Sequence, residues 1–343
     1  MILHILSSAF HSVEFVKFMQ QHYELITHKF VYVRPDVCKY GLSEFKEVVH
    51  VDSPVKTISL LYKMHKAERI ILHGLWRKEV ISLLYHFPWL LKKCYWLLWG
   101  GDFCLGKESY SKEHSYVIQN VGYLVGVKGD CEEIKKSYQS LKANFIFIKN
   151  FYPANTFYGE LKISDNRGKT IILVGNSADK LNCHKEIFEK LLPFNQENIE
   201  IICPLSYGSE QKYIENIVVL GNQYFGSKFK PLLYFMPPKE YYQMLEKVDI
   251  AVFAHKNQQA FGNLVALLGM GKKVYMRKTS AWDTFDDLGV KLFDYEGNFS
   301  LEAMELQDAV ANYKIIKKEF SLQEKIKEYY HVLGEYPKNL KTC

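Results

Sequence analysis

Short apolar runs rich in β-branched and aromatic residues alternate with longer amphipathic runs along the chain. This alternation is typical of βα units that build a parallel sheet. In the first half the expected strands are Ile2–Leu6, Phe30–Val33, Val48–Val51, Arg69–Leu72, Tyr95–Trp99, Tyr123–Val127 and Phe145–Ile148. The expected helices between them include Val55–Ala67, Lys78–Tyr85 and Glu132–Leu141. One α/β domain accommodates these elements.

A second series begins after the polar stretch 164–169, whose turn-forming residues predict a linker. Its expected strands are Thr170–Val174, Ile199–Cys203, Leu232–Phe235, Asp249–Phe253 and Lys273–Tyr275. Its expected helices are His184–Leu192, Glu210–Phe225, Lys239–Lys247 and Gln259–Gly269, and a helical pattern resumes at about Leu301.

The pattern therefore predicts an α/β fold of two Rossmann-like domains facing a central cleft. We place the first domain at residues 1–155 and the second at 165–310, with helices over 311–343 crossing back onto the first domain. A chain of 343 residues exceeds the usual size of one hydrophobic core, which favours two domains. In such folds ligands bind at the carboxyl ends of the strands, so the loops at those ends carry the candidate chemistry.

Composition changes this picture little. Hydrophobic residues make up 48% and charged residues 24%, which is a globular composition and excludes a disordered chain. Seven scattered cysteines without a Cys-x-x-Cys pair indicate neither zinc nor a disulfide framework, so a reducing cytoplasm fits best. The longest apolar stretch, Val80–Leu91, is interrupted by His86 and Pro88, so we expect no transmembrane segment. The formal charge of +6 is mild, and we expect no nucleic-acid partner.

Three loops of the second half are candidates for binding a nucleotide sugar. Each follows an expected strand and is rich in glycine, hydroxyl or amide groups, which suit a diphosphate and sugar hydroxyls. The alternative is that they are ordinary turns and helix caps. The candidate donor-binding residues are Gly175, Asn176, Ser177, Asn182, His184, Ser206, Tyr207, Gly208, Gln258, Gln259, Gly262 and Asn263.

Two motifs of the first half are candidates for catalysis. His73 and Asp102 follow adjacent expected strands, and either side chain is able to take a proton from an acceptor hydroxyl. Trp76 and Trp99 offer flat faces to an acceptor sugar. The alternative is a core histidine and a Gly-Gly-Asp turn, and the sequence does not choose between the two bases.

An aromatic and basic stretch from Arg77 to Trp96 suits the surface of an anionic membrane. The alternative is a buried helix and strand with a solvated lysine turn between them. Residues 1–160 carry +5 of the net charge, with 20 Lys and Arg against 15 Asp and Glu, so the first half has the basic surface. The chain lacks a dinucleotide fingerprint and a Walker loop, and we expect neither a bound cofactor nor a catalytic metal.

These motifs, taken in order, resemble the TDP-N-acetylfucosamine:lipid II N-acetylfucosaminyltransferase family. The likeness spans about residues 70 to 275, through His73–Trp76, Tyr95–Asp102, Val174–Asp179, Pro204–Gly208 and Gln258–Asn263. The resemblance implies a GT-B fold, a TDP-sugar donor held mainly by the second domain, and a polyprenyl-diphosphate-linked saccharide acceptor at the first domain. It also implies peripheral attachment to the inner face of the cytoplasmic membrane, in bacterial surface polysaccharide synthesis. A nucleotide-sugar epimerase of the same fold and a non-catalytic assembly protein of the membrane surface are the alternatives.

Overall fold

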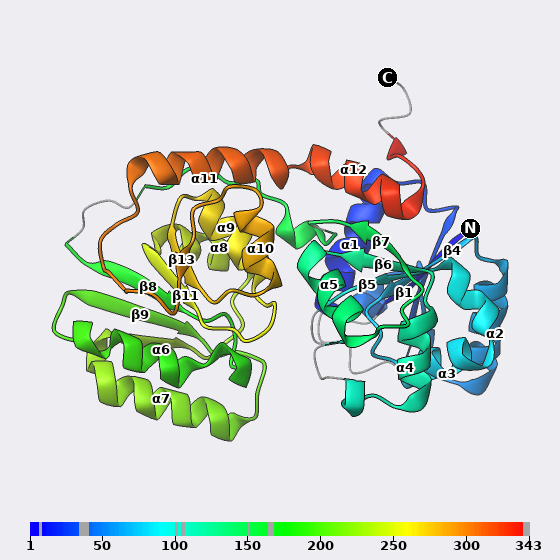
Figure 1. The fold of residues 1–343 in the computed structure, drawn as a ribbon, viewed down its shortest axis with the longest axis horizontal. Helices are drawn as coiled ribbons and strands as arrows, with labels where there is room; N and C mark the ends of the chain where they lie inside the picture. Colours follow the sequence, from blue (N-terminus) through cyan, green and yellow to red (C-terminus); the bar gives the residue numbers. More distant parts are fainter. Residues whose placement is uncertain are drawn as a thin grey trace. The chain divides into compact units, whose positions relative to one another are not determined.

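The computed structural model describes residues 1–6, 9–33, 41–99, 102–103, 107–149, 151–163 and 168–338. Most of the expected linker, together with Gly100 and Gly101 of the Trp99–Asp102 motif, lies outside these residues. The chain forms two compact units, one of Met1–Ala154 with Leu322–Cys343 and the other of Asn155–Ser321 (Figure 1). None of the described helices is both long and apolar enough to span a bilayer.

Unit 1 is built on a parallel sheet that has the strand order β3-β2-β1-β4-β5-β6-β7 in the described residues. The strands are β1 (Ile2–Leu6), β2 (His28–Val33), β3 (Val48–Val51), β4 (Arg69–His73), β5 (Cys94–Leu97), β6 (Tyr123–Gly126) and β7 (Asn144–Phe147). The helices are α1 (Ala9–His22), α2 (Pro54–Lys66), α3 (Lys78–His86), α4 (Lys112–Asn120), α5 (Lys128–Ser137) and α12 (Leu322–Leu333), with the 3₁₀ segment η2 (Pro88–Lys93).

Each face of this sheet has its own core. Side chains of α2, α3, α4 and α5 pack with Trp96 and the neighbouring strand residues on one face. Side chains of α1 and α12 pack with Phe30 and Ile71 on the other face. Every residue of β1 is buried, as expected for a central parallel strand that is covered on both sides.

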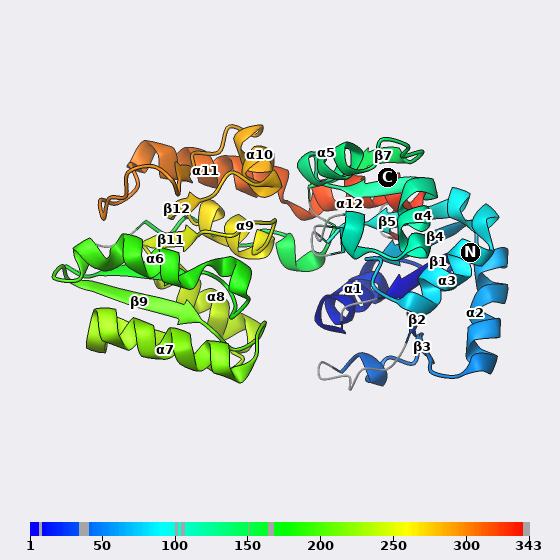
Figure 2. The ribbon, with the colours of Figure 1, turned by 60° about the horizontal axis from the view of Figure 1, so that its bottom comes forward.

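Unit 2 has the strand order β10-β9-β8-β11-β12-β13 in the described residues. The strands are β8 (Thr170–Val174), β9 (Ile199–Pro204), β10 (Phe229–Leu232), β11 (Ile250–Phe253), β12 (Lys273–Met276) and β13 (Phe293–Asp294). The helices are α6 (His184–Leu191), α7 (Gln211–Phe225), α8 (Pro238–Lys247), α9 (Phe261–Gly269), α10 (Ser280–Asp286) and α11 (Leu306–Glu319). Helices α6 and α7 cover one face of the sheet, and α8, α9 and α11 lie on the other (Figure 1 and Figure 2).

Several elements differ from the sequence predictions. Strand β10 lies three residues earlier than expected, because the apolar run 233–235 is at the surface and the edge strand tolerates Pro231. Helix α5 begins four residues before its expected start, and the sequence pattern did not predict α1 or α4. The chain passes from unit 2 to unit 1 between α11 and α12, within the segment expected to cross back.

Candidate functional site

The strand order of unit 2 reverses between β8 and β11, which lie side by side. The chain leaves β8 toward β9 on one side, whereas β11 extends the sheet on the other side. Loops at the carboxyl ends of such neighbouring strands diverge and leave room for a ligand. The loops after β8, β9 and β11 contain all twelve candidate donor residues together with the starts of α6 and α9, so the topology brings these segments to one edge of the sheet.

Asn182 joins the loops after β8 and β11. Its side chain is fully buried, and its Oδ1 accepts from the backbone N–H of Asn176 at 2.9 Å and from Nε2 of His255 at 2.8 Å. Its Nδ2 donates to Ser177 Oγ and to Gln259 Oε1, both at 3.3 Å. Both polar atoms of the amide are therefore in use, and one side chain fixes two loops against each other.

The loop after β9 is fixed to the loop after β8 by the backbone. The Ala178 N–H donates to the carbonyl of Tyr207 at 2.7 Å, and Nδ2 of Asn176 reaches the Tyr207 hydroxyl at 3.5 Å. Gly175 and Gly208 have φ of +65° and +107°, which side chains rarely adopt. A Cβ on Gly175 would lie 2.5 Å from Asn182 Oδ1, so glycine permits this close packing.

The start of α9 presents free backbone donors at the same edge. Ala260 precedes the helix in the left-handed conformation, with φ of 56°, and no side chain caps the first turn. Uncapped N–H groups and the helix dipole favour a bound anion such as a diphosphate. Asn263 Nδ2 donates to the Tyr241 hydroxyl at 2.9 Å, and Gln258, Gly262 and Asn263 are half-buried.

Two buried histidines of this edge are neutral. Burial lowers the pKa of His184 to about 4, and burial together with His184 lowers the pKa of His255 to about 3. Because Asn182 Oδ1 only accepts, His255 carries its proton on Nε2. His255 was not among the residues predicted to bind a ligand, although it begins the amide-rich segment after β11.

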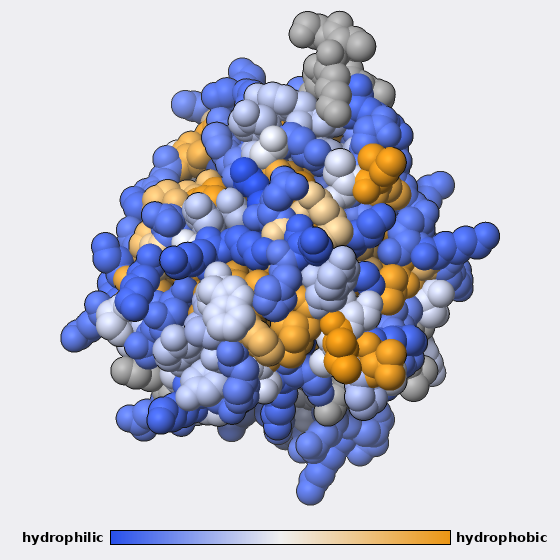
Figure 3. Space-filling model, turned by 90° about the vertical axis from the view of Figure 1, so that its right-hand side faces the viewer, coloured by the Kyte–Doolittle hydropathy of each residue, from blue (hydrophilic) through white to orange (hydrophobic). Residues whose placement is uncertain are grey.

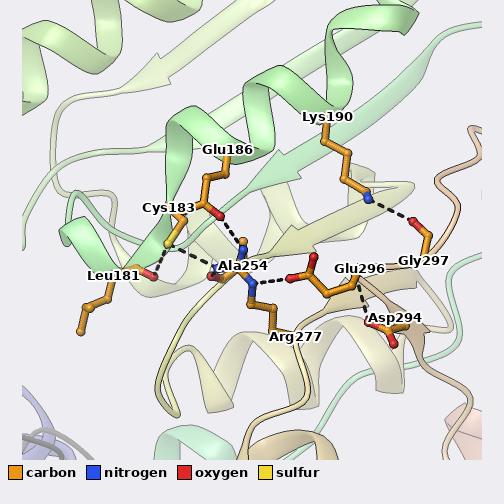
Figure 4. A network of polar contacts seen from close by, with 9 residues as sticks. All are labelled: Leu181, Cys183, Glu186, Lys190, Ala254, Arg277, Asp294, Glu296 and Gly297. Atoms are coloured by element: carbon orange, nitrogen blue, oxygen red, sulfur yellow. Dashed lines mark hydrogen bonds and ion pairs between the residues drawn. The ribbon is translucent and has the colours of Figure 1, made fainter.

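Arg277, which directly follows β12, links the loop after β11 to the start of α6 through hydrogen bonds (Figure 4). Its Nη1 donates to the carbonyl of Ala254 at 2.8 Å, its Nε donates to Glu296 at 2.7 Å, and its Nη2 pairs with Glu186 at the start of α6. Its Nη1 also contacts the sulfur of Cys183, a residue with φ of 56°. The sequence pattern does not reveal this network, since its members lie in four separate segments.

An open hollow of about 460 Å³ adjoins the loops after β8 and β9. It is lined by Asp179, Lys180, Gly208, Ser209 and Glu210. Tyr207 lies beside it in sequence and is 51% exposed, so its ring is accessible to a ligand. Within the described residues, no group of three or more His, Cys, Asp or Glu is arranged to hold a metal ion.

In unit 1, Asp102 is buried and accepts three hydrogen bonds. Its Oδ2 accepts from the Leu75 N–H at 3.0 Å and from Trp96 Nε1 at 2.7 Å, and its Oδ1 accepts from the Trp99 N–H at 3.0 Å. Burial raises the pKa of Asp102 to about 6, although these hydrogen bonds lower it. The carboxylate thus ties the loop after β4 to the loop after β5.

His73 is also buried, and burial lowers its pKa to about 3. Its ring contacts Tyr152 and a second histidine, His4, rather than solvent. The structure does not place a hydrogen bond between His73 and Asp102. Trp76 is 46% exposed in the loop after β4, whereas Trp99 is half-buried against Tyr152 with ring centres 4.5 Å apart.

The aromatic and basic stretch divides between surface and core. Tyr95 and Trp96 of β5 are buried, so their predicted place at a membrane surface is wrong. They occupy a buried strand, as the alternative interpretation predicts. Trp89 of η2 is 56% exposed and Lys92 is exposed, so this part of the stretch remains at the surface.

Two Rossmann-type sheets, the second with polar loops at its switch point, are the architecture of the GT-B fold of glycosyltransferases. Solved structures share the fold over 97% of this chain: a glycosyltransferase from Rickettsia africae (15% identity, TM-score 0.63, 98% of that chain), HepE from Anabaena in complex with UDP (10%, 0.70, 99%) and the lipopolysaccharide outer core galactosyltransferase WaaB (10%, 0.61, 99%). At these identities the likeness establishes the fold. The chain belongs to glycosyl transferase group 56, the 4-alpha-L-fucosyltransferase family, whose family model matches residues 2–319. The predicted glycosyltransferase family is confirmed.

Proposed function

We propose that this enzyme transfers a deoxy-amino sugar, or a related hexose, from a nucleoside diphosphate to a polyprenyl-diphosphate-linked saccharide. TDP is the expected carrier, and bacterial surface polysaccharide synthesis is the expected setting. The observation that carries the donor half is the meeting of three loops at the switch point of unit 2, where Asn182 joins the loops after β8 and β11 and the Ala178–Tyr207 backbone bond joins the loop after β9. The family membership and the motif resemblance support the sugar and the acceptor.

In this proposal the donor diphosphate lies at the uncapped start of α9 and along the loop Gly175–Ser177. The charge of the leaving diphosphate is then stabilised by the backbone N–H groups of the first turn of α9, since the N–H groups of Gly175 and Asn176 already donate to Val252 and Asn182. Fixed donors need no reorganisation during the reaction, and the hydrogen bonds of Asn182 hold them in place. No metal or cofactor is part of this mechanism.

The acceptor half is assigned to unit 1, where the sequence left His73 and Asp102 as candidate bases. Because both side chains are buried and hydrogen-bonded, we propose that neither contacts the acceptor directly. Asp102 positions Trp99, which with Trp76 is proposed to receive the acceptor sugar. His73 is proposed to pass on the proton that the acceptor hydroxyl releases.

Thermal unfolding with TDP, UDP and GDP tests the donor site. At about 100 times its Kd, a ligand of the native state stabilises it by about 2.7 kcal/mol, which raises the Tm of a unit of this size by about 5 to 10 °C. We expect TDP to give the largest shift. Transfer of label from the donor to lipid-linked saccharide should require the acceptor. Conversion of the donor alone would indicate an epimerase, and the lack of any shift would contradict the donor site.

We further propose that unit 1 docks on the inner face of the cytoplasmic membrane through the outer side of α2. Val55, Ile58 and Tyr62 are 75%, 69% and 64% exposed and recur at helical spacing, so they form one apolar stripe. The opposite side of α2 buries Leu60 and Met64 in the core, so the stripe is not needed for folding. Apolar side chains reach the surface among hydrophilic ones on this side of unit 1 (Figure 3).

Aromatic and basic groups surround this stripe. Trp89 lies beside α2, where its Nε1 contacts His65 Nε2 at 3.2 Å. Helix α2 contains three lysines and no carboxylate, and Lys92 is exposed in η2. This combination suits an anionic lipid surface. The aliphatic side chains and the indole enter the headgroup region, and the lysines around them attract the anionic lipids.

Binding to vesicles checks this surface. We expect the double variant Val55→Ser and Ile58→Ser to lose about tenfold or more of its affinity for phosphatidylglycerol-containing vesicles, since two apolar side chains no longer enter the bilayer. Wild-type protein should bind phosphatidylcholine vesicles more weakly. The double variant Leu233→Ser and Tyr234→Ser removes exposed apolar groups from unit 2 and should bind normally. Equal binding of the α2 variant, or loss of self-association instead, would contradict membrane docking.

A further inference from the structure

A continuous chain of hydrogen bonds runs through the core of unit 1. The Tyr152 hydroxyl lies 3.1 Å from His73 Nδ1, and His73 Nε2 lies 3.2 Å from His4 Nδ1. His4 Nε2 lies 2.9 Å from His28 Nδ1, and His28 Nε2 contacts the carboxylate of Glu335. The three imidazoles therefore connect a tyrosine in the core to a carboxylate near the surface.

This chain of hydrogen bonds crosses the sheet of unit 1 diagonally. His28 begins β2, His4 occupies the middle of β1, and His73 ends β4. The strand registers pair Ile2 with His28 and His4 with Ile71, so the three rings lie on one face and advance from the amino edge to the carboxyl edge. The carboxyl edge is the side where the Trp99–Asp102 loop lies.

The direction of every bond follows from Glu335. An ionised carboxylate only accepts, so His28 Nε2 must carry a proton, and Nδ1 of the neutral ring accepts. Since His28 Nδ1 accepts, His4 Nε2 must donate to it, and for the same reason His73 Nε2 donates to His4 Nδ1. All three rings carry their proton on Nε2, and the Tyr152 hydroxyl donates into the chain. A one-directional chain of this kind is able to move a proton by shifting each hydrogen along its own bond.

The surroundings keep the imidazoles neutral. His4 packs between Phe15 and Phe30, with ring centres 5.2 and 4.9 Å away. Burial, with His28 and His73 as neighbours, holds the pKa of His4 well below its usual range. His28 is buried, whereas the side chain of Glu335 is 25% exposed, so the chain opens to solvent at Glu335.

Other titratable and charged groups face the two ends of the chain. At the outer end, the phenol of Tyr23 lies beside His28, with ring centres 6.1 Å apart, and the Met1 ammonium acts on His28. Arg69 donates to the carbonyl of Val332 at 2.7 Å, close to the segment that carries Glu335.

At the inner end, Tyr152 contacts Trp99 and His11, with ring centres 4.5 and 5.5 Å away. Burial raises the pKa of Tyr152, and the charge of Asp102 raises it further. Buried Lys325 donates to the backbone carbonyl of Tyr152 at 2.7 Å, so the segment that carries the tyrosine is fixed to α12. The inner end thus lies against the candidate acceptor loop.

We propose that Tyr152, His73, His4, His28 and Glu335 form a proton wire that carries the proton released by the acceptor hydroxyl out to solvent. This inference rests on the proposed sugar transfer. As the acceptor oxygen bonds to the sugar, its proton reaches the Tyr152 oxygen, and the tyrosine proton moves to His73 Nδ1. The Nε2 protons of His73 and His4 move to the next Nδ1 in turn, and the Nε2 proton of His28 moves to Glu335.

One proton enters this wire and one leaves it, and only O–H and N–H bonds change. No charged imidazole accumulates in the core, which would be costly there. Between turnovers Glu335 releases its proton to solvent. The rings then rotate so that each Nε2–H again donates toward the ionised carboxylate. Any row of neutral imidazoles that ends on a carboxylate has this donor direction, so the direction permits proton transfer, and kinetics must distinguish the wire from a structural cluster.

A double-mutant cycle between the two ends tests the wire. Tyr152→Phe keeps the ring and removes the inner hydroxyl, and Glu335→Gln keeps an acceptor oxygen and removes proton uptake. We expect each variant to lower kcat about tenfold or more with unchanged donor affinity, and the double variant to lower it no further. The solvent isotope effect on kcat should be lost in all three. Glu133→Gln, an exposed carboxylate of α5, is the matched control and should retain wild-type kcat.

Histidine nitrogen NMR of the wild-type protein gives a readout that needs no substrate. It should show the Nε2–H form for His4, His28 and His73, so failure of the wire is distinguishable from failure of the proposed transfer. An Nδ1–H form in any of the three rings would overturn the proposal. Additive losses in the cycle, or wild-type kcat and isotope effect in Glu335→Gln, would also overturn it.

Discussion

Replacement of Asn182 by leucine is expected to abolish donor binding at concentrations that saturate the wild-type enzyme. Leucine has nearly the same shape as asparagine but no polar atoms. The change leaves the Asn176 N–H, the His255 ring, Ser177 and Gln259 without their shared partner. Each buried polar group left unsatisfied costs about 1 to 3 kcal/mol, so we expect a loss of about 4 kcal/mol in the free energy of unfolding.

Nucleotide titration and denaturant unfolding of the same variant measure these two effects. Asn182→Asp keeps an oxygen that accepts from Asn176 and His255 but loses the donor to Ser177 and Gln259, so it should lose less stability than Asn182→Leu, yet its charge should repel the diphosphate. Asn222→Leu, at an exposed position of α7, is the matched control and should change neither quantity. If Asn182→Leu bound TDP with wild-type affinity, the loops joined by Asn182 would not form the donor site.

A steep loss of stability is expected as the pH falls below about 6.5. Burial holds the pKa of His4 well below its usual range, and it lowers the pKa of His73 to about 3 and the pKa values of His11 and His114 to about 4. The unfolded chain binds protons at these residues below pH 6.5, whereas the folded protein does not. Their contribution is therefore fully present above pH 6.5 and is lost as the pH falls toward 4. Asp102, with its pKa raised to about 6, opposes the trend by one proton.

Three net protons correspond to about 4 kcal/mol of unfolding free energy per pH unit in unit 1. His184 and His255 add about 3 kcal/mol per pH unit in unit 2, by the same reasoning. Two pH units below 6.5 remove about 8 kcal/mol from unit 1, which exceeds a net stability in the lower half of the usual range of about 5 to 15 kcal/mol, so unfolding of unit 1 near pH 4.5 is expected. Circular dichroism and tryptophan fluorescence between pH 8 and 4 check it. A stability that stays constant down to pH 4.5 would mean that these histidines are charged in the folded protein.

The sequence predicted the fold well where the hydrophobic period was strong. Strands β1, β3 and β8 lie where the apolar runs indicated. Strands β1 and β8 are central parallel strands, which are apolar on both faces, whereas β3 is an edge strand with a short apolar run. The prediction is wrong at β10, because the apolar run 233–235 lies at the surface and the strand precedes it. Helix α5 was displaced for a related reason, because its first turn, at Lys128–Asp130, carries no apolar pattern.

The candidate donor loops could be found because glycine and amide clusters after strands are visible in the sequence. Their closure around Asn182 was not visible, since Asn182 and Gln259 are far apart in the chain. The membrane prediction depended on aromatic residues, two of which are buried in β5, whereas the exposed stripe of α2 resembles an ordinary helix face in sequence.

The sequence by itself determined the alternation of strands and helices, the two Rossmann-type domains, the family and the loops that carry polar chemistry. These features depend on local periodicity and on residues close together in the chain. Only the tertiary structure decided that Asp102 and His73 are buried and hydrogen-bonded, and that His4, His28 and His73 form one chain ending at Glu335. A histidine in an apolar strand has the same local pattern whether its ring is isolated or paired. Its partners are chosen by strand register and packing, which act between distant segments.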